Sequence, residues 1–273
     1  DDFTHQAQAI GSQLVLNAGF NCLTPRVILQ HATWDGRAPL NAAINHYLSR
    51  IAPRDAYYPG AAERHSTFMT AHPGANLHGD AAEGELPWTY IEGVDSAEPD
   101  DIVFTTEPFC SIMSETALEA PDDASFLDAA VDFVNENLWG TLCAGIVIHP
   151  DSLADPAVHA AYERAKANLR YGSICVNAAT AFGYAVMNTS WGGHSGAVLE
   201  DIQSGIGVVN NLLLFDGDHI QKSVLETSFR SPLNQADTGD LSFAKLSEKL
   251  LYVEAQPSLR TLADLIVTAV RVS

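Results

Sequence analysis

The sequence predicts an α/β fold: a three-layer αβα arrangement around a mostly parallel sheet. Between residues 122 and 177, amphipathic helical segments alternate with apolar strand-like runs over short links, which is the order of βαβ units. The helix expected over 155–172 has Asp155 as its cap, Pro156 at its first position and Gly172 after its last turn. The strand-like runs are almost wholly apolar, as in a sheet whose two faces are both covered.

The amino-terminal elements also show helical and strand periodicity. Residues 1–17 place apolar side chains three or four positions apart behind an Asp cap, which predicts an amphipathic helix. Gly19 stands where that helix would end. The run "RVIL" (26–29) predicts a short buried strand, and residues 38–51 predict a second helix with one apolar face.

The middle of the chain has a different composition. Residues 52–101 are rich in Pro, Gly, Asp and Ala, and they predict little regular structure beyond a short helix at 61–69. A stretch this long without structure of its own is often functional or an insertion. The run "DIVFTTEPFCSIMS" (101–114) then predicts one or two strands with a break at Pro108.

The remaining elements complete the expected order. A glycine-rich turn is expected at "WGGHSG", followed by a strand at "GVVNNLLLF" (207–215). The other predicted elements are a helix over 122–138, strands over 141–149 and 173–177, and two apolar-striped helices over 241–254 and 258–270.

Composition limits the function. A chain of 273 residues with 47% hydrophobic content can bury a sizeable core. The formal charge of −20 makes an acidic protein and argues against nucleic acid, which needs clustered Lys and Arg. No apolar run of eighteen residues predicts a membrane span. The chain begins at "DDFTHQ" without a basic-then-apolar leader, so we expect a cytoplasmic protein whose amino-terminal part precedes this stretch.

The four cysteines, at positions 22, 110, 143 and 175, show no CxxC or zinc-like spacing, so we expect free thiols and no metal site. Cys22 follows "NAGFN" and precedes Pro25, which places it on a turn between packed elements. A thiolate there can attack a carbonyl carbon, and backbone N–H groups of the turn can hold the resulting oxyanion. A packed structural thiol is the alternative at this position.

Several segments occur in an order that resembles the carboxy-terminal, catalytic half of the aldehyde dehydrogenase superfamily. "NAGFNC" (17–22) resembles the motif of the family's catalytic cysteine, N-x-G-Q-x-C, and "TEPFCS" (106–111) resembles Glu-x-Phe-Gly-Pro. "FVNENLWGTLCAGIVIHP" (133–150) is similar to the Ala-Asn-x-x-x-Tyr-Gly-Leu segment. The stretch from "LRYGSICVN" through "NTSWGGHSG" (169–196) is similar to the Gly-x-Val-x-Asn and Pro-Phe-Gly-Gly-x-Lys-x-Ser-Gly run. The resemblance covers about residues 3–225.

The resemblance assigns roles to individual residues. It implies that Cys22 is the catalytic nucleophile and that Glu107 hydrogen-bonds the ribose of the nicotinamide cofactor. Phe109 would pack beside the nicotinamide ring. Trp191 and Phe20 would line the substrate pocket. The implied cofactor is NAD or NADP, and the implied reaction oxidises a small-molecule aldehyde to a carboxylic acid through a cysteine thiohemiacetal and thioester.

The resemblance also implies how the chain is organised. Residues 1–225 would form a catalytic domain like that of aldehyde dehydrogenases, with 52–100 as a divergent irregular segment, and 226–273 would form a helical extension. In the family, the cofactor-binding domain, a second oxyanion donor and the general base precede the cysteine. We therefore expect a catalytic lobe that is inactive without its missing amino-terminal cofactor-binding domain. The family commonly assembles through a segment like "HIQKSVL" (219–225), so a homodimer or tetramer is also implied.

Departures from the family motifs keep two alternatives open. Phe20 replaces a glutamine, Cys110 and Ser111 replace Gly-Pro, and His194 replaces a lysine. One alternative is a cysteine esterase or thioesterase that works without a nucleotide and uses a histidine near Cys22. The other is a non-catalytic module of the same fold kept for assembly. A thiol with a depressed pKa would argue against that module, and a slow-reacting, buried thiol would favour it.

Overall fold

The computed structural model describes residues 1–211, 222–231 and 241–272. Contacts between Cα atoms divide the chain into two units, Asp1–Gln235 and Ala236–Ser273. Each unit is described by itself. Two expectations extend beyond these residues: positions 212–215 of the strand predicted over 207–215, and positions 219–221 of "HIQKSVL", lie outside the described part of the chain.

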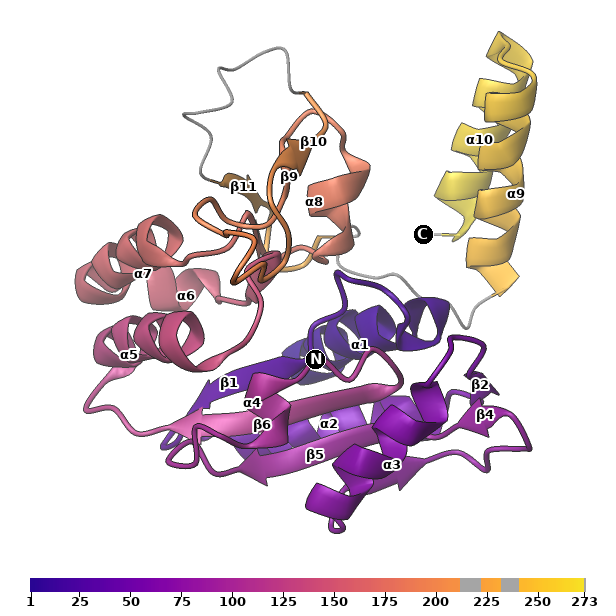
Figure 1. Cartoon of the computed structure of the whole chain (residues 1–273). Coiled ribbons are helices and arrows are strands. Elements are labelled where there is room, and N and C mark those ends of the chain that lie inside the picture. The colour runs from indigo at the N-terminus through magenta and orange to yellow at the C-terminus, as the bar shows by residue number, and fades with distance from the viewer. Residues whose placement is uncertain (212–221, 232–240, 273) are drawn as a thin grey trace. The chain divides into compact units, whose positions relative to one another are not determined.

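The first sheet of unit Asp1–Gln235 has the strand order β1-β6-β5-β3 (Figure 1). These strands are Val27–His31 (β1), Ile112–Leu118 (β6), Trp88–Val94 (β5) and Asn76–His78 (β3). β1, β6 and β5 run parallel, and β3 is antiparallel to β5. The surrounding helices are Asp2–Val15 (α1), Arg37–Ser49 (α2), Ala61–Ala71 (α3) and Ile102–Thr105 (α4).

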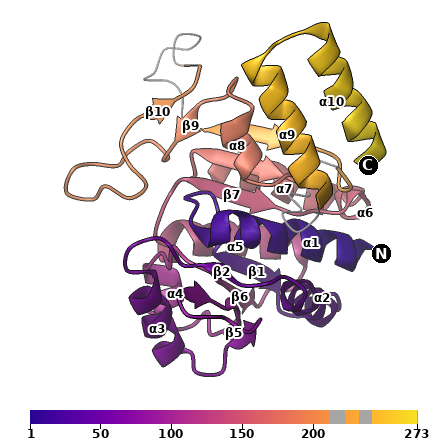
Figure 2. The ribbon, with the colours of Figure 1, turned by 90° about the vertical axis from the view of Figure 1, so that its right-hand side faces the viewer.

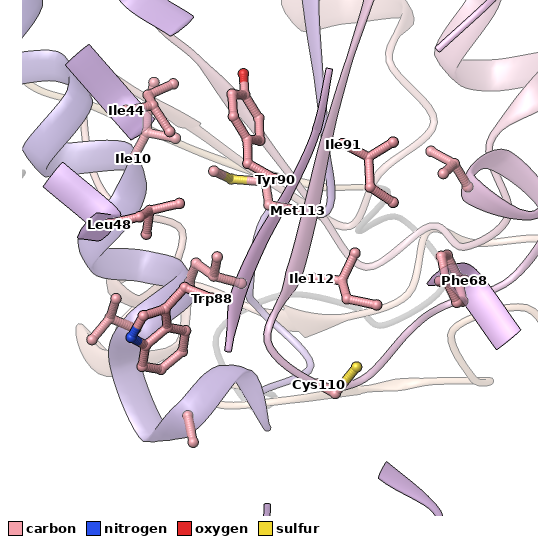
Figure 3. Packing of buried hydrophobic residues seen from close by; sticks show 14 of the residues in the cluster. Ile10, Ile44, Leu48, Phe68, Trp88, Tyr90, Ile91, Cys110, Ile112 and Met113 are labelled. Carbon is pink, nitrogen blue, oxygen red and sulfur yellow. The ribbon is translucent and has the colours of Figure 1, made fainter. Parts of the chain in front are cut away.

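The core of this sheet follows the alternation of side chains along β5 and β6 (Figure 3). Trp88 and Tyr90 of β5 and Met113 of β6 point to the side of α1 and α2, and none of the three is exposed. Ile91 and Ile112 point to the opposite side, where Phe68 of α3 lies. This period of two in a strand with helices on both faces is what a three-layer arrangement requires.

The second sheet has the order β11-β8-β7, and all three strands are parallel. They are Ser223–Glu226 (β11), Ser173–Val176 (β8) and Cys143–Ile146 (β7). The helices near this sheet are Asp123–Asn137 (α5), Pro150–Leu153 (α6), Pro156–Asn168 (α7) and Ala181–Ala185 (α8). Two short antiparallel pairs, Arg54–Asp55 (β2) with Glu85–Leu86 (β4) and Trp191–Gly192 (β9) with Val208–Val209 (β10), complete the unit. The predicted α/β class with mostly parallel sheets is confirmed.

The amino-terminal capping signals of the sequence work as expected, whereas α7 ends at Asn168 with Leu169 as its C-cap, before the predicted end at Gly172. The carboxylate of Asp155 accepts a hydrogen bond from the Ala157 N–H at 2.7 Å, with Pro156 at the first helical position. The Asp122 carboxylate accepts from the Ser125 N–H at 2.8 Å at the start of α5. An N-terminal carboxylate satisfies a free backbone donor and lies favourably against the helix dipole.

The short helix expected at 61–69 is confirmed as α3, but the prediction of little other structure over 52–101 is wrong. This segment also contains β2, β3, β4 and β5, and β5 lies between β6 and β3 in the first sheet. β5 is buried over Trp88–Ile91 but carries Glu92 and Gly93 at exposed positions. The mixed composition around it therefore conceals a central strand.

Three other boundaries differ from expectation. "DIVF" forms helix α4 instead of a strand, because the Asp101 carboxylate caps it by accepting from the Val103 N–H at 2.9 Å. The strand expected over 141–149 is limited to Cys143–Ile146 and is only half-buried. Within the described part of 207–215, the strand is limited to Val208–Val209.

Unit Ala236–Ser273 is a hairpin of two helices, α9 (Leu241–Ala255) and α10 (Leu259–Val272), drawn in yellow in Figures 1 and 2. The two helices pack side by side, and Lys249 Nζ lies 2.9 Å from Asp264 Oδ2 across them. Both predicted helices of this region are confirmed. Among the residues described, no helix has the length and apolar character needed to cross a bilayer.

Candidate active site

The turn that carries Cys22 begins with an unusual backbone. α1 runs into a single 3₁₀ turn, Leu16–Gly19, in which Asn17, Ala18 and Gly19 have φ angles of 54°, 55° and 80°. Three successive left-handed residues are costly for L-amino acids, because Cβ approaches the following carbonyl oxygen. The turn therefore needs strong local support.

Two asparagines and one glycine supply that support. Asn17 Nδ2 donates to the Phe20 carbonyl and to Asn21 Oδ1, both at 3.1 Å, and Asn21 Nδ2 donates to the Leu16 carbonyl at 3.0 Å. A Cβ on Gly19 would lie 2.4 Å from the Cys110 carbonyl oxygen, so only glycine fits this approach. The polar residues of "NAGFNC" thus fix the turn, and they leave Cys22 exposed at its end.

A second loop, 106–111, faces this turn and carries Glu107 and Phe109. Phe109 has a φ of 39°, again in the left-handed region. Arg64 of α3 holds the loop from one side: its Nε donates to the Pro108 carbonyl at 2.9 Å, and an Nη donates to the Phe109 carbonyl at 3.1 Å. The loop carbonyls are thereby paired without regular secondary structure.

Arg26 joins the two loops. Its guanidinium donates to the carbonyl of Gly19 in the Cys22 turn, and to those of Cys110 at 2.6 Å and Ile112 at 3.2 Å. Desolvation lowers the pKa of Arg26 to about 10, so the side chain stays charged at neutral pH. One arginine therefore fixes the position of Cys22 relative to the loop that bears Glu107.

Burial opposes ionisation at two of the predicted site residues, Cys22 and Glu107. Partial desolvation, together with the nearby Glu107 carboxyl, raises the pKa of the exposed Cys22 thiol above its ordinary value. Desolvation also raises the pKa of Glu107, although Arg26 and Arg64 act in the opposite direction. The thiol is thus accessible, as a nucleophile must be, but it is mostly protonated at neutral pH.

This electrostatic arrangement predicts how Cys22 reacts with iodoacetamide. Since the thiolate is the reactive form, the alkylation rate should keep rising with pH beyond the range of an ordinary thiol. Glu107→Gln removes a negative charge that opposes the thiolate, so alkylation at pH 7.5 should become severalfold faster. Mass spectrometry of the Cys22 peptide measures the rate, and Glu136→Gln serves as a matched control. An unchanged or slower rate in Glu107→Gln would contradict the claim that the Glu107 carboxyl raises the pKa of Cys22.

An aromatic cluster lies directly before Cys22 in the chain. Phe20 is 5% exposed, and its ring centroid lies 4.8 Å from that of Tyr57, 5.8 Å from that of Tyr58 and 6.3 Å from that of Phe109. Tyr58 also contacts Phe109 edge-to-face at 4.8 Å. The structure therefore brings Phe20 and Phe109 together. Tyr57 and Tyr58 are not among the residues predicted for the site, and the adjacent "YY" is the only signal for them in the sequence.

Trp191 lies elsewhere. It is buried on β9, where its ring meets Tyr184 of α8 edge-to-face at 5.8 Å and lies against Gly183. Among the described residues, its recorded ring contact is with Tyr184 and not with the Phe20 cluster. The structure therefore does not join Trp191 to the other predicted site residues.

The second sheet also reaches the Cys22 turn. The N–H of Thr180, the residue before α8, donates to Gln13 Oε1 of α1 at 3.0 Å, and its hydroxyl donates to the carbonyl of Leu23, the neighbour of Cys22. Cys143 at the start of β7 interacts electrostatically with Cys22 and Glu107, and burial raises its pKa. The sequence does not link this second thiol to the site, because 121 positions separate it from Cys22.

No group of three or more metal-ligating side chains is found within residues 1–211, 222–231 and 241–272.

No family model matches the sequence of this chain, and no curated protein matches it. Solved structures do match its fold. A salicylaldehyde dehydrogenase of Pseudomonas putida complexed with salicylaldehyde matches with a TM-score of 0.59 and 17% identity, over 77% of this chain and 41% of that chain. An indole-3-acetaldehyde dehydrogenase of P. syringae in complex with NAD⁺ gives a TM-score of 0.57 and 19% identity, over 80% and 42%.

A third similar structure carries the other dinucleotide. A glyceraldehyde-3-phosphate dehydrogenase of Methanocaldococcus jannaschii complexed with NADP gives a TM-score of 0.54 and 17% identity, over 76% of this chain and 42% of that chain. This chain has the fold of part of an aldehyde dehydrogenase. It spans about two fifths of the length of these structural neighbours.

Proposed function

We propose that this chain is the cysteine-bearing lobe of an NAD(P)-dependent aldehyde dehydrogenase. The observation that carries the proposal is the Arg26 clamp, which fixes the turn of Cys22 against the loop of Glu107 and Phe109 in a fold shared with such enzymes. The three residues come from two sequence motifs that are distant along the chain. The substrate would be a small-molecule aldehyde, in line with the names of the neighbours.

In the proposed reaction, Cys22 acts twice. Its thiolate sulfur bonds to the aldehyde carbon and gives a thiohemiacetal, whose oxygen accepts a hydrogen bond from the Cys22 N–H. When the carbonyl reforms, hydride leaves the carbon and a thioester remains on sulfur. Water then displaces the sulfur, which releases the carboxylic acid and regenerates the thiol.

NAD or NADP, when bound, supplies the acceptor for that hydride. The residues present fit such a group: the Glu107 carboxylate can accept hydrogen bonds from a ribose diol, and the partly exposed Phe109 ring offers an apolar surface to a planar ring. The raised pKa of Cys22 means that a base must take its proton before attack. We propose that the base and the dinucleotide-binding domain come from an amino-terminal part of the protein, so the chain alone should be inactive.

The test is aldehyde oxidation by the longer protein that contains this chain, followed through NAD(P)H. Cys22→Ala should lower kcat by at least about 10³-fold, as expected when a covalent nucleophile is removed. Cys175→Ala, which alters a thiol that is 0% exposed on β8 of the second sheet, is the matched control and should keep its activity. Unchanged turnover in Cys22→Ala would overturn the proposal.

The two alternatives make different predictions. The charged group that raises the pKa of Cys22 is the Glu107 carboxyl, whereas the esterase would use a histidine near the thiol. The raised pKa of Cys22 is the one property described above that is also expected of a non-catalytic module. That alternative would be favoured if the whole protein bound NAD(P) but oxidised no aldehyde.

A further inference from the structure

Two neighbouring tyrosines between β2 and α3 present ring surfaces to solvent beside the Cys22 turn. Tyr57 is 61% exposed and Tyr58 is 44% exposed, although both rings pack against the buried ring of Phe20. Each tyrosine ring uses one face to cover Phe20. That contact does not explain why both positions carry aromatic side chains whose other faces are exposed to water.

Both tyrosines are held in fixed positions. The Tyr57 hydroxyl donates to Asn17 Oδ1 at 3.0 Å, and Asn17 in turn donates to Asn21, the residue directly before Cys22. Tyr58 lies edge-to-face on Phe109, and the Arg64 guanidinium stands 5.9 Å from its ring centroid. Rings ordered before binding lose little entropy when a ligand arrives, and therefore they bind well.

The surface beside Tyr57 is concave. An open groove of about 420 Å³ is lined by Tyr57 but not by Tyr58, and its other lining residues are Asn17, Ala18, Pro53, Arg54, Asp55 and Glu85. This volume lies within the range of small-molecule sites. One arginine and two carboxylates at the rim leave it without the positive excess that an anion would need.

We propose that Tyr57 and Tyr58 form a binding surface for a planar, uncharged aromatic ring, and that this ring is the remote end of the aldehyde that Cys22 attacks. The reacting end of the ligand rests on the function proposed above, whereas the ring site rests on the tyrosines alone. The hydrogen bonds from Tyr57 through Asn17 to Asn21 couple the position of the ring surface to the Cys22 turn. Binding of the ring then orients the substrate before attack.

The first test needs no turnover. The probe is 2-naphthylmethanol, an aromatic alcohol that cannot react with Cys22, and its binding to the 273-residue chain is measured by its fluorescence anisotropy. The double variant Tyr57→Ser, Tyr58→Ser should weaken its binding by about tenfold, the loss typical of removing aromatic anchors. Tyr57→Phe, Tyr58→Phe keeps both rings and should bind within about twofold of the wild type.

Two controls separate the ring site from other apolar surface and from the catalytic proposal. Tyr252→Ser removes a tyrosine that is 51% exposed on α9 and should leave the affinity unchanged. Cys22→Ala should bind the probe as the wild type does. Equal affinity in the double serine variant and the wild type, or an equal loss in Tyr252→Ser, would overturn the ring site.

The second test uses the longer protein and two substrates, 2-naphthaldehyde and propanal. The double serine variant should lose about tenfold in kcat/KM for the aromatic aldehyde while that for propanal changes little. An equal loss for both aldehydes would overturn the substrate assignment. No turnover of either aldehyde by the wild type would overturn the proposed function, while the probe titration would still decide whether the ring site exists.

Discussion

Replacing Trp88 by alanine is expected to lower the free energy of unfolding by about 3–5 kcal/mol, the range for deleting a large buried aromatic side chain. Trp88 is 0% exposed at the start of β5, with its ring against the α1–α2 side of the sheet (Figure 3). Its indole N–H also donates to the Ala52 carbonyl at 3.2 Å. The substitution therefore leaves both a cavity and a buried carbonyl without its donor.

The matched control is Trp34→Ala. Trp34 is 43% exposed and packs on Phe3, so its removal should cost less than about 1.5 kcal/mol. Urea unfolding followed by circular dichroism gives both values. Equal losses in the two variants would show that β5 is not the central element of the first core.

The second large effect is expected at Arg26. Replacing it with leucine removes the donor of the Gly19 and Ile112 carbonyls, at about 1–3 kcal/mol for each buried group that stays unpaired, while the Cys110 carbonyl keeps the Ile112 N–H at 2.9 Å. We therefore expect a total loss of about 2–6 kcal/mol in the free energy of unfolding, less whatever water recovers. Arg26→Lys should restore only part of this, because an ammonium lacks the fork of donors that spans two loops.

Arg26→Leu should also release the Cys22 turn. In native protein without denaturant, the rate of Cys22 alkylation should change. The effect of Glu107→Gln on that rate should change as well, because the two loops are no longer tied together. Arg50→Leu, at an exposed position just after α2, is the control. If Arg26→Leu unfolds at the same urea concentration as Arg50→Leu and keeps the wild-type alkylation profile, the clamp does not hold the site.

Local signals in the sequence were sufficient for part of the fold. The Asp155–Pro156 start of α7 and the apolar stripe of α1 are properties of neighbouring residues, so periodicity and capping rules recover them. β5 was missed because its Pro- and Gly-rich surroundings resemble a loop, and only pairing with β6 and β3 makes it a central strand. "DIVF" was misread because its β-branched residues outweighed the capping signal of Asp101.

The site shows the same division. Cys22, Glu107, Phe109 and Phe20 are proposed as site residues from short motifs, since each motif is contiguous. Arg26 and Arg64 could not be found in this way, because they bind backbone carbonyls in a distant loop, and carbonyls leave no mark in a sequence. Tyr57 and Tyr58 could not be linked to Phe20 until the path of the chain after β2 was known.

The most direct test of the central claim is whether the substrate becomes covalently attached to Cys22. The longer protein is mixed with an equimolar aldehyde and NAD(P)⁺, quenched with acid at several times within the first turnover, and digested for mass spectrometry. The account predicts that the Cys22 peptide carries the acyl group, as a thioester that hydroxylamine removes, and that Cys22→Ser forms product far more slowly. Formation of the carboxylic acid at the wild-type rate in Cys22→Ser, with Cys22 never modified in the wild type, would contradict it.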